Sequence, residues 1–568
     1  MQRRRWTAMA AGAATLALAA SGCSLLEGSS DDGDPTSSSS TPSSTPSSTR
    51  AQSSFELFDP PAQGRDWVVL VDEPGDTTQV ADALEADGFD LTSTNSAVGM
   101  ITLRSEDDDV AERAEAIEGV GAAVTDRQAG WTPEPPAEPT PGDTTPARDL
   151  PSPPAAPEGG DPLDGFLWGM ETIDASGAHQ VTQGRREVRV GVMDTGVDAT
   201  HPDLAPVLDT QLSESFVADI VDLDGRCESK GCVDPVGTDD NGHGTHVAGT
   251  IAAAANDLGV IGVAPGATLV DLRAGQDSGM FFLGPTVNAL THAADQRLDV
   301  VNMSFYLDPW LLACRGGAPG DTPEQADAQD VAIELMHRAH DLTHEAGVTL
   351  ISSAGNESSD VGAARRDDTS PNYGGETRSR RVDPQRCERL PLDGEHVIGV
   401  ASVDEDGQRS TFSNWTSVLD RDQVDVAAPG GEETDGMGGV LSAMPRDLAL
   451  AEGAIDDRGR VTEEGARRVV RGCPTGIGDT DPDPDGRCGL YTWLQGTSMA
   501  SPHASGVAAL VISAHGDRMA PADVAAKLEQ SATDAPCPPD EGSVRCVGTT
   551  ERNGIFGEGV VNAARAVR

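Results

Sequence analysis

Cations are what this 568-residue chain has least of. Lysine occurs only at Lys230 and Lys527, and 40 lysines and arginines stand against 93 acidic residues, which gives a formal net charge of −53. A protein that binds nucleic acid needs basic patches to neutralise phosphate, so this balance excludes nucleic acid as an expected partner. A solvated acidic surface is the plain interpretation, and tolerance of high salt through self-repulsion is the sharper one.

Long apolar runs are also missing after the first 23 residues, so we expect no second membrane anchor. The first residues themselves form an export signal: Arg3-Arg4-Arg5 precedes an Ala-rich stretch, Ala8 to Ala20, that is too short to span a bilayer. The following LAASGC, which ends at Cys23, resembles the lipobox of bacterial lipoproteins. The resemblance implies lipid on Cys23, hence contact with the outer face of the cell membrane, whereas an ordinary signal peptide would give a secreted protein.

Zinc-type CxxC pairs are absent as well, and no histidines flank the cysteines, which speaks against a zinc site. The chain has nine cysteines, and an even set of eight remains once Cys23 is set aside for lipid. An exported protein meets oxidising conditions, so we expect disulfides, although eight cysteines allow about 105 connectivities. Short loops suggest these pairs: Cys227–Cys232, Cys473–Cys488 and Cys537–Cys546, which leaves Cys314–Cys387.

Composition divides the chain into five parts. Residues 1–23 are the signal, 24–65 form a Ser/Thr/Pro-rich tether, and 129–162 form a Pro-rich linker. Between these linkers, residues 66–128 show apolar runs and amphipathic segments in the order βαββαβ, which predicts a small ferredoxin-like α+β unit. The remainder, 163–568, alternates apolar strands with helices.

The large region predicts a parallel sheet covered on both faces. Nearly continuous apolar runs favour strands of that kind, and they occupy Val188–Val192, Leu269–Leu272, Val300–Met303, Val348–Ser352 and Val397–Ser402. Two segments rich in small residues, Val247–Ala255 and Ala500–Ile512, predict tightly packed helices. The fold class is therefore α/β, three-layered, with a parallel sheet.

Three short motifs carry groups that together make a nucleophile. Asp194 ends the first strand in MDTGVD, His243 opens HGTHVAG at a glycine turn, and Ser498 lies in GTSMASPH where the last helix begins. A serine hydroxyl needs a base, and the base needs an orienting carboxylate. Each residue alone has a plainer interpretation: a turn aspartate, a structural histidine and a helix cap. Because the carboxyl ends of parallel strands gather working residues, we expect the three to meet.

In this order the motifs resemble those of the subtilisin-like serine peptidases, the subtilases, from roughly Trp168 to Ala566. The resemblance implies Asp194 as orienter, His243 as base and Ser498 as nucleophile, with hydrolysis of peptide bonds through an acyl-enzyme. His246 matches a structural histidine of the family. The segment SAGN, which ends at Asn356, looks like the family's oxyanion segment, so the Asn356 amide would donate to the tetrahedral intermediate.

The resemblance also implies substrate-binding roles for Ser304, Tyr306 and Gly355. Tyr306 stands where the family usually has glycine, in a strand that pairs with the substrate backbone. Its ring either narrows the cleft, which predicts restricted specificity, or swings out and lines only the rim. A dedicated maturation peptidase for one exported substrate would fit the first alternative.

No metal is assigned from the sequence. Asp203 matches a calcium ligand of many subtilases, but the partner loop at 255–260 looks one residue shorter than the calcium-binding form, and calcium needs several oxygen ligands. Calcium near Asp203 therefore stays open, and we expect no other cofactor.

The small unit at 66–128 resembles the family's propeptide by pattern and position, which implies a zymogen whose own propeptide is a partner. An extra sugar- or peptide-binding domain is the plainer alternative. The sequence as a whole predicts an exported serine endopeptidase that acts on peptides or proteins. The competing hypothesis is a catalytically silent surface scaffold with the same fold, which would have no need to retain all four site residues.

Overall fold

The computed structural model describes residues 54–58, 64–127, 156, 160–227, 229–372, 377–419, 423–432, 438–474, 481–516, 518–539 and 544–568. Cys23 with the export signal, most of the predicted tether and most of the linker at 129–162 lie outside these ranges. In the described part, no helix is both long enough and apolar enough to cross a bilayer.

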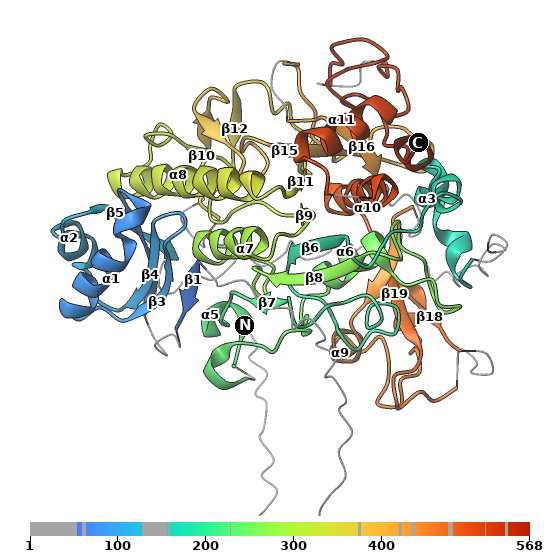
Figure 1. Ribbon diagram of the computed structural model, residues 1–568, viewed down its shortest axis with the longest axis horizontal. Helices are drawn as coiled ribbons and strands as arrows, with labels where there is room; N and C mark the ends of the chain where they lie inside the picture. The colour runs from blue at the N-terminus through green and yellow to red at the C-terminus, as the bar shows by residue number, and fades with distance from the viewer. Residues whose placement is uncertain are drawn as a thin grey trace, which may run out of the picture. The chain divides into compact units, whose positions relative to one another are not determined.

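A seven-stranded parallel sheet forms the centre of the large unit (Figure 1), as the apolar runs predict. Its order is β16-β15-β11-β9-β6-β8-β7. The strands are β6 (Arg189–Asp194), β7 (Glu214–Ser215), β8 (Thr268–Arg273), β9 (Val300–Met303), β11 (Thr349–Ser353), β15 (Val397–Val403) and β16 (Val426–Pro429). The five predicted strands are confirmed, while β7 and β16 are too short to stand out in the sequence.

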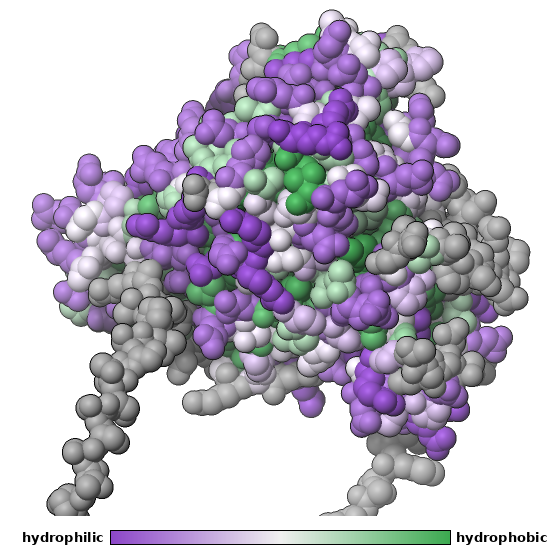
Figure 2. All heavy atoms as spheres, turned by 45° about the vertical axis from the view of Figure 1, so that its right-hand side comes forward, coloured by the Kyte–Doolittle hydropathy of each residue, from purple (hydrophilic) through white to green (hydrophobic). Residues whose placement is uncertain are grey.

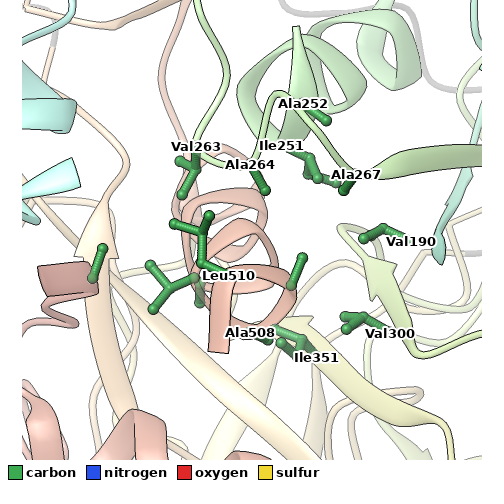
Figure 3. Close-up of a cluster of buried hydrophobic side chains, with 14 of the residues drawn as sticks. Val190, Ile251, Ala252, Val263, Ala264, Ala267, Val300, Ile351, Ala508 and Leu510 are labelled. Atoms are coloured by element: carbon green, nitrogen blue, oxygen red, sulfur yellow. The ribbon is translucent and has the colours of Figure 1, made fainter. Parts of the chain in front are cut away.

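Helices cover both faces of this sheet, which gives the three layers predicted. On one face lie α6 (His243–Ala252) and α10 (Thr497–His515), and on the other α7 (Leu283–Asp295) and α8 (Pro323–Glu345). Figure 3 shows Ala508 of α10 beside the strand residue Ile351. Because α10 is buried on nearly all sides, only small residues allow its neighbours to approach, which explains its Ala, Ser and Gly content.

Shorter elements complete the large unit. These are α3 (Trp168–Thr172), α4 (Ala175–His179), α5 (Val221–Asp224), β10 (Ala313–Cys314), β12 (Arg365–Asp367), β13 (Arg380–Val382), β14 (Cys387–Glu388), β17 (Val440–Met444), α9 (Arg446–Ala451), β18 (Val469–Gly472), β19 (Gly489–Leu494), α11 (Pro521–Ser531) and α12 (Ala563–Ala566), with 3₁₀ turns at Asp164–Phe166, Lys230–Cys232 and Gly465–Arg467. A further 3₁₀ turn, Pro74–Asp76, belongs to the small unit. Strands β17, β19 and β18 form an antiparallel sheet of their own.

The small unit has its elements in the predicted order. They are β2 (Arg65–Val71), α1 (Thr77–Ala86), β3 (Leu91–Asn95), β4 (Met100–Ser105), α2 (Val110–Glu115) and β5 (Val120–Arg127). The antiparallel order β3-β4-β2-β5 is that of a ferredoxin-like sheet. One boundary of the prediction is wrong: β1 (Phe55–Leu57), assigned to the tether, pairs with β3 at the sheet edge because its backbone completes the ladder there.

The small unit packs against α7 and α8 of the large one. Asp126 accepts hydrogen bonds from the backbone N–H groups of Leu283 and Gly284, at 3.0 and 2.9 Å, where α7 begins. The Asn95 amide donates to Asn288 on the same helix at 3.0 Å. From α8, Arg338 donates to the carbonyl oxygens of Val71 and Val98 at 3.0 and 3.1 Å. Polar side chains therefore fasten both helices to the small sheet.

The three cysteine pairs that the short loops suggested are formed, and so is the remaining pair: Cys227–Cys232, Cys473–Cys488, Cys537–Cys546 and Cys314–Cys387. The Cys314–Cys387 bond joins β10 to β14, which also pair as strands. On the face drawn in Figure 2, hydrophilic residues predominate, with smaller apolar patches between them. That face agrees with the solvated surface expected from the charge.

Candidate active site

The groups expected to react gather at one edge of the parallel sheet. Asp194 is the last residue of β6, Ser304 follows β9 directly, and Asn356 lies in the loop after β11. His243 opens α6 and Ser498 lies in the first turn of α10. Because the strands run parallel, their carboxyl ends bring segments far apart in the sequence into one place.

His243 and Asp194 form a tight pair. The distance from His243 Nδ1 to Asp194 Oδ1 is 2.7 Å, and the same oxygen accepts the Thr195 N–H at 2.8 Å. The carboxylate is fully buried, whereas the imidazole is 27 % exposed. Burial acts to lower the pKa of His243, but the charge and hydrogen bond of Asp194 outweigh it, so the pKa is raised. The pair therefore holds one tautomer, with Nε2 left for a further proton.

Asp239, which the motif reasoning missed, shapes the turn that carries the histidine. Its two carboxylate oxygens accept the N–H groups of Gly242 and Thr245, at 2.8 and 2.9 Å, and both threonine hydroxyls, those of Thr245 and Thr195. The Thr195 hydroxyl in turn accepts the Gly244 N–H at 3.0 Å. The backbone at Gly244 lies so close to that of Gly196, in the Asp motif, that a Cβ on Gly244 would fall 2.1 Å from the Gly196 carbonyl oxygen. One buried carboxylate thus locks the Asp and His motifs together.

The Ser498 hydroxyl rests on the neighbouring strand. It donates to the Ser304 carbonyl at 3.0 Å, and within the described chain no hydrogen bond joins it to His243. The Ser498 carbonyl, which lacks a helical partner because Pro502 has no N–H, accepts the Ser304 hydroxyl at 3.0 Å.

Buried hydroxyls hold the start of α10 in place behind Ser498. Ser501 and Ser505 both donate to the Asn302 amide oxygen, at 2.7 and 2.9 Å, and the Asn302 amide nitrogen donates to Ser304 at 2.9 Å. All four side chains are buried. A network of this kind, satisfied on each member, fixes the position of the nucleophile relative to β9.

Asn356 is oriented by its neighbour across the site. Its amide oxygen accepts the N–H and the hydroxyl of Thr497, at 2.9 and 2.8 Å. The Thr497 hydroxyl also accepts the Gly355 N–H at 3.0 Å. Because the oxygen is held, the Nδ2 group is the end that remains for a substrate. The Thr497 contact was not predicted, although its place beside Ser498 in the motif is a signal.

A cavity of about 330 Å³ runs along these groups. Ser498, His243 and Asn356 line it together with the predicted substrate-binding residues, which are Ser304, Tyr306 and Gly355. Tyr306 is among the lining residues, which both alternatives for its ring allow. Its hydroxyl accepts a hydrogen bond from Asn372 at 3.2 Å, and the same amide donates to Asp308. Burial raises the pKa of Asp308 to about 7.

An ion pair that the sequence reasoning missed lines the same cavity. Arg389 pairs with Glu357, which follows Asn356, and the arginine side chain is only 4 % exposed. Burial acts to raise the pKa of Glu357, but the Arg389 charge and hydrogen bonds from Arg389 and Asn414 lower it. In the sequence, only the expected Cys314–Cys387 pair indicated that the segment around Arg389 lies near the segment that follows Tyr306.

His246, the second histidine of its motif, has the structural place that the resemblance implies. It is fully buried, and its Nε2 lies 3.0 Å from the carbonyl of Val440 and 3.2 Å from that of Thr492. Burial lowers its pKa to about 3, so the ring stays neutral and ties α6 to strands β17 and β19. It does not belong to the reacting groups.

The residues around Asp203 do not fit calcium. One carboxylate oxygen accepts the Tyr491 hydroxyl at 2.6 Å and the Val260 N–H at 3.2 Å, and the other accepts the Asn256 amide at 3.1 Å. Burial raises the pKa of Asp203 to about 7. Calcium needs six to eight oxygen ligands with free lone pairs, whereas hydrogen-bond donors surround this carboxylate. The phenol takes the place beside Asp203 that an ion would need.

A second acidic group consists of Asp219, Asp234 and Asp277. An arginine of the same chain lies beside it. Arg273 pairs with Asp234 at 2.9 Å and with Asp277. The guanidinium therefore pairs with two of the three carboxylates, and we assign no metal to the group.

Comparison with known proteins decides the family. The model of the subtilase family, Peptidase S8, matches residues 185–559, which include all three motifs and Asn356. The chain belongs to the subtilase family. It is a subtilisin-like serine endopeptidase, as its relatives and its fold agree.

Curated subtilases of bacilli are similar to this one at modest identity. Subtilisin DY of Bacillus licheniformis is 27 % identical over 346 residues, which is 61 % of this chain and 84 % of the relative. The major intracellular serine protease of Bacillus subtilis is 28 % identical over 57 % of this chain and 68 % of its own length.

Two solved structures share the subtilase fold. The epidermin leader peptide processing serine protease EpiP from Staphylococcus aureus has a TM-score of 0.57 at 18 % identity, covering 89 % of this chain and 98 % of its own. Fervidolysin from Fervidobacterium pennivorans, a keratinolytic enzyme related to subtilisin, has a TM-score of 0.52 at 22 % identity, covering 91 % and 64 %.

Proposed function

We propose that this endopeptidase cleaves peptide bonds with Ser498 as nucleophile, His243 as general base and Asp194 as orienting carboxylate. The observation that carries the proposal is the 2.7 Å bond between His243 and the buried Asp194, on the cavity that Ser498 and Asn356 also line. The fixed tautomer leaves Nε2 to take the Ser498 proton once the hydroxyl leaves the Ser304 carbonyl. His243 then returns that proton to the leaving amine, and water releases the acyl group by the reverse sequence.

The oxyanion of each tetrahedral intermediate would meet two donors. Asn356 offers Nδ2 because Thr497 holds its oxygen. The Ser498 backbone N–H lies in the first turn of α10, where helix N–H groups have no partner within the helix. Donors that are already oriented cost no reorganisation when charge develops.

The small unit acts as a propeptide in this proposal. Asp126 caps the start of α7, and Arg338 on α8 holds two carbonyl groups of the small sheet. Contacts of that kind suit a unit that folds with the enzyme and leaves after cleavage. Independent sugar or peptide binding, the alternative use, would not need them.

Export and lipid attachment at Cys23 rest on the sequence signal alone. If maturation cuts within residues 129–162, the lipid stays with the propeptide and the enzyme is released. N-terminal sequencing of the mature protein tests this directly. A start beyond residue 128 supports release, and a lipidated Cys23 on the mature chain would show that the enzyme stays anchored.

A fluorophosphonate label separates the enzyme from the silent scaffold. We expect covalent labelling of the processed protein, its loss in Ser498→Ala, and full labelling in Ser379→Ala, whose serine is exposed on the same unit. Equal labelling of Ser498→Ala and wild type would refute the nucleophile. No labelling of processed wild type would favour the scaffold.

A further inference from the structure

The cavity that adjoins Ser498 must receive the side chain of the residue before the scissile bond, here called P1. Placing the P1 carbonyl carbon at Ser498 and its oxygen at Asn356 would put that side chain in the cavity that both residues line, where Gly355 is also part of the lining. The lining there continues to Glu357 and Arg389. The chemistry of this ion pair therefore bears on which P1 residue is accepted, given the proposed function.

Arg389 is fixed where it stands. Two residues before it, Cys387 forms a disulfide with Cys314, and the backbone N–H of Arg389 donates to the Asp393 carboxylate at 2.7 Å. The guanidinium lies directly against Gly355, since a Cβ built there would fall 2.3 Å from Arg389 Nη1. With a φ of +98°, Gly355 also has a backbone that disfavours other residues. The arginine is therefore a rigid part of the wall.

The pair leaves hydrogen-bonding capacity on both members. Arg389 Nη2 is engaged with Glu357 Oε2, which also accepts the Asn414 amide at 2.6 Å. Arg389 Nη1 has only a long contact of 3.4 Å with Glu357 Oε1. Arg389 Nη1 and Glu357 Oε1 therefore share only this long contact, so each can form a further hydrogen bond. The Glu357 side chain is 29 % exposed, which leaves it accessible from the cavity.

We propose that the Arg389–Glu357 pair selects glutamine or asparagine at P1. A carboxamide accepts from Arg389 Nη1 through its oxygen and donates to Glu357 Oε1 through its nitrogen. A carboxylate would meet Glu357, and an ammonium group would meet Arg389, each a like charge. An aromatic ring would remove water from the Arg389 guanidinium and the Glu357 carboxylate without offering either a hydrogen bond. The Tyr306 ring would also limit the space available to it.

The test is kcat/KM of the processed enzyme on peptide p-nitroanilides that differ only at P1, with glutamine, glutamate, lysine or phenylalanine. We expect glutamine to exceed each of the others by about tenfold or more, as for one hydrogen bond to a charged group. Glu357→Gln should raise the glutamate-to-glutamine ratio about tenfold, and Arg389→Met should raise the lysine-to-glutamine ratio similarly. Arg366→Met, at an arginine 71 % exposed, is the matched control and should change neither ratio.

Fluorophosphonate labelling of each variant counts active sites and keeps the two proposals apart. Labelled wild type that prefers phenylalanine, or ratios that do not respond to Glu357→Gln, would overturn the P1 assignment and leave the nucleophile standing. Absence of labelling would fail the proposed function itself. If Arg389→Met does not fold, the test rests on the glutamate-to-glutamine ratio of Glu357→Gln. That variant should fold, because residue 357 is partly exposed and glutamine keeps an oxygen that accepts hydrogen bonds.

Discussion

The two walls of the cavity are held by different means. The wall with His243 and Ser498, which includes neither the buried Asp194 nor any other residue of β6, is made of helix starts at the carboxyl edge of the parallel sheet. The wall with Tyr306 and Arg389 is made of loop segments that a disulfide and side-chain amides tie down. If the proposed roles hold, the sheet positions the reacting groups, whereas the groups proposed to select the substrate lie on loop segments outside it.

The largest effect should come from the carboxylate that pairs with His243 of the first wall. Asp194→Asn keeps the size of the side chain but no longer fixes the His243 tautomer, so kcat should fall about 10⁴-fold. Stopped assays at saturating substrate measure this loss, with thermal unfolding as the check on folding. A decrease of less than tenfold would show that Asp194 does not orient the base.

Asn356→Ala should come next, with kcat lower by about 10²–10³ and KM nearly unchanged, because the oxyanion exists only after attack. Thr497→Val tests the orientation of Asn356, since it removes the hydroxyl that donates to the Asn356 amide oxygen but keeps the shape of the side chain. Its kcat should fall by about tenfold, as for one hydrogen bond. A rise in KM alone, in either variant, would place Asn356 in ground-state binding instead.

Tyr491→Phe probes a region outside both walls. It leaves one oxygen of the buried Asp203 without its 2.6 Å partner and should lower the free energy of unfolding by about 1–3 kcal/mol. Denaturant unfolding measures the change. Added calcium should not restore the loss, and full recovery with calcium would mean that the phenol had merely displaced an ion.

The smallest effect concerns pH. In the proposed mechanism neutral His243 is the base, so activity should be lost as pH falls through its pKa, and the raised pKa moves that loss to a higher pH. The acid limb of kcat/KM should therefore have its midpoint above the ordinary histidine value of about 6.5. His337→Gln, on α8 and outside the cavity, should leave the limb in place. A midpoint at or below 6.5 would contradict the coupling to Asp194.

Most of the first wall could be predicted from sequence because each residue lies in a short motif whose chemistry is local. Ser498, His243 and Asp194 were picked out by motifs that resemble those of the subtilases, together with the expectation that parallel strands end at one edge. Short loops suggested three of the cysteine pairs, and Cys314–Cys387 was the pair that remained, although the sequence alone did not exclude other connectivities. Small strands such as β7 and β16 were missed because two to four residues give no period to read.

The second wall could not be predicted in the same way. Arg389 meets Glu357 only because the chain between them folds back through the Cys314–Cys387 bond, and no local pattern marks an arginine as buried. Tyr491 and Asp203 are likewise far apart in sequence, so the short loop raised doubt about calcium without revealing what stands in its place. Tertiary contacts of single side chains decide both cases.

The central claim is that peptide hydrolysis passes through an acyl group on Ser498. Rapid quenching in acid of the processed enzyme with an ester substrate that has glutamine at P1, followed by mass spectrometry of its peptides, tests this most directly. The account predicts a mass increase equal to the acyl group on the peptide that contains Ser498, and none in Ser498→Ala. Turnover with no acylated peptide, or acylation at another residue, would contradict it.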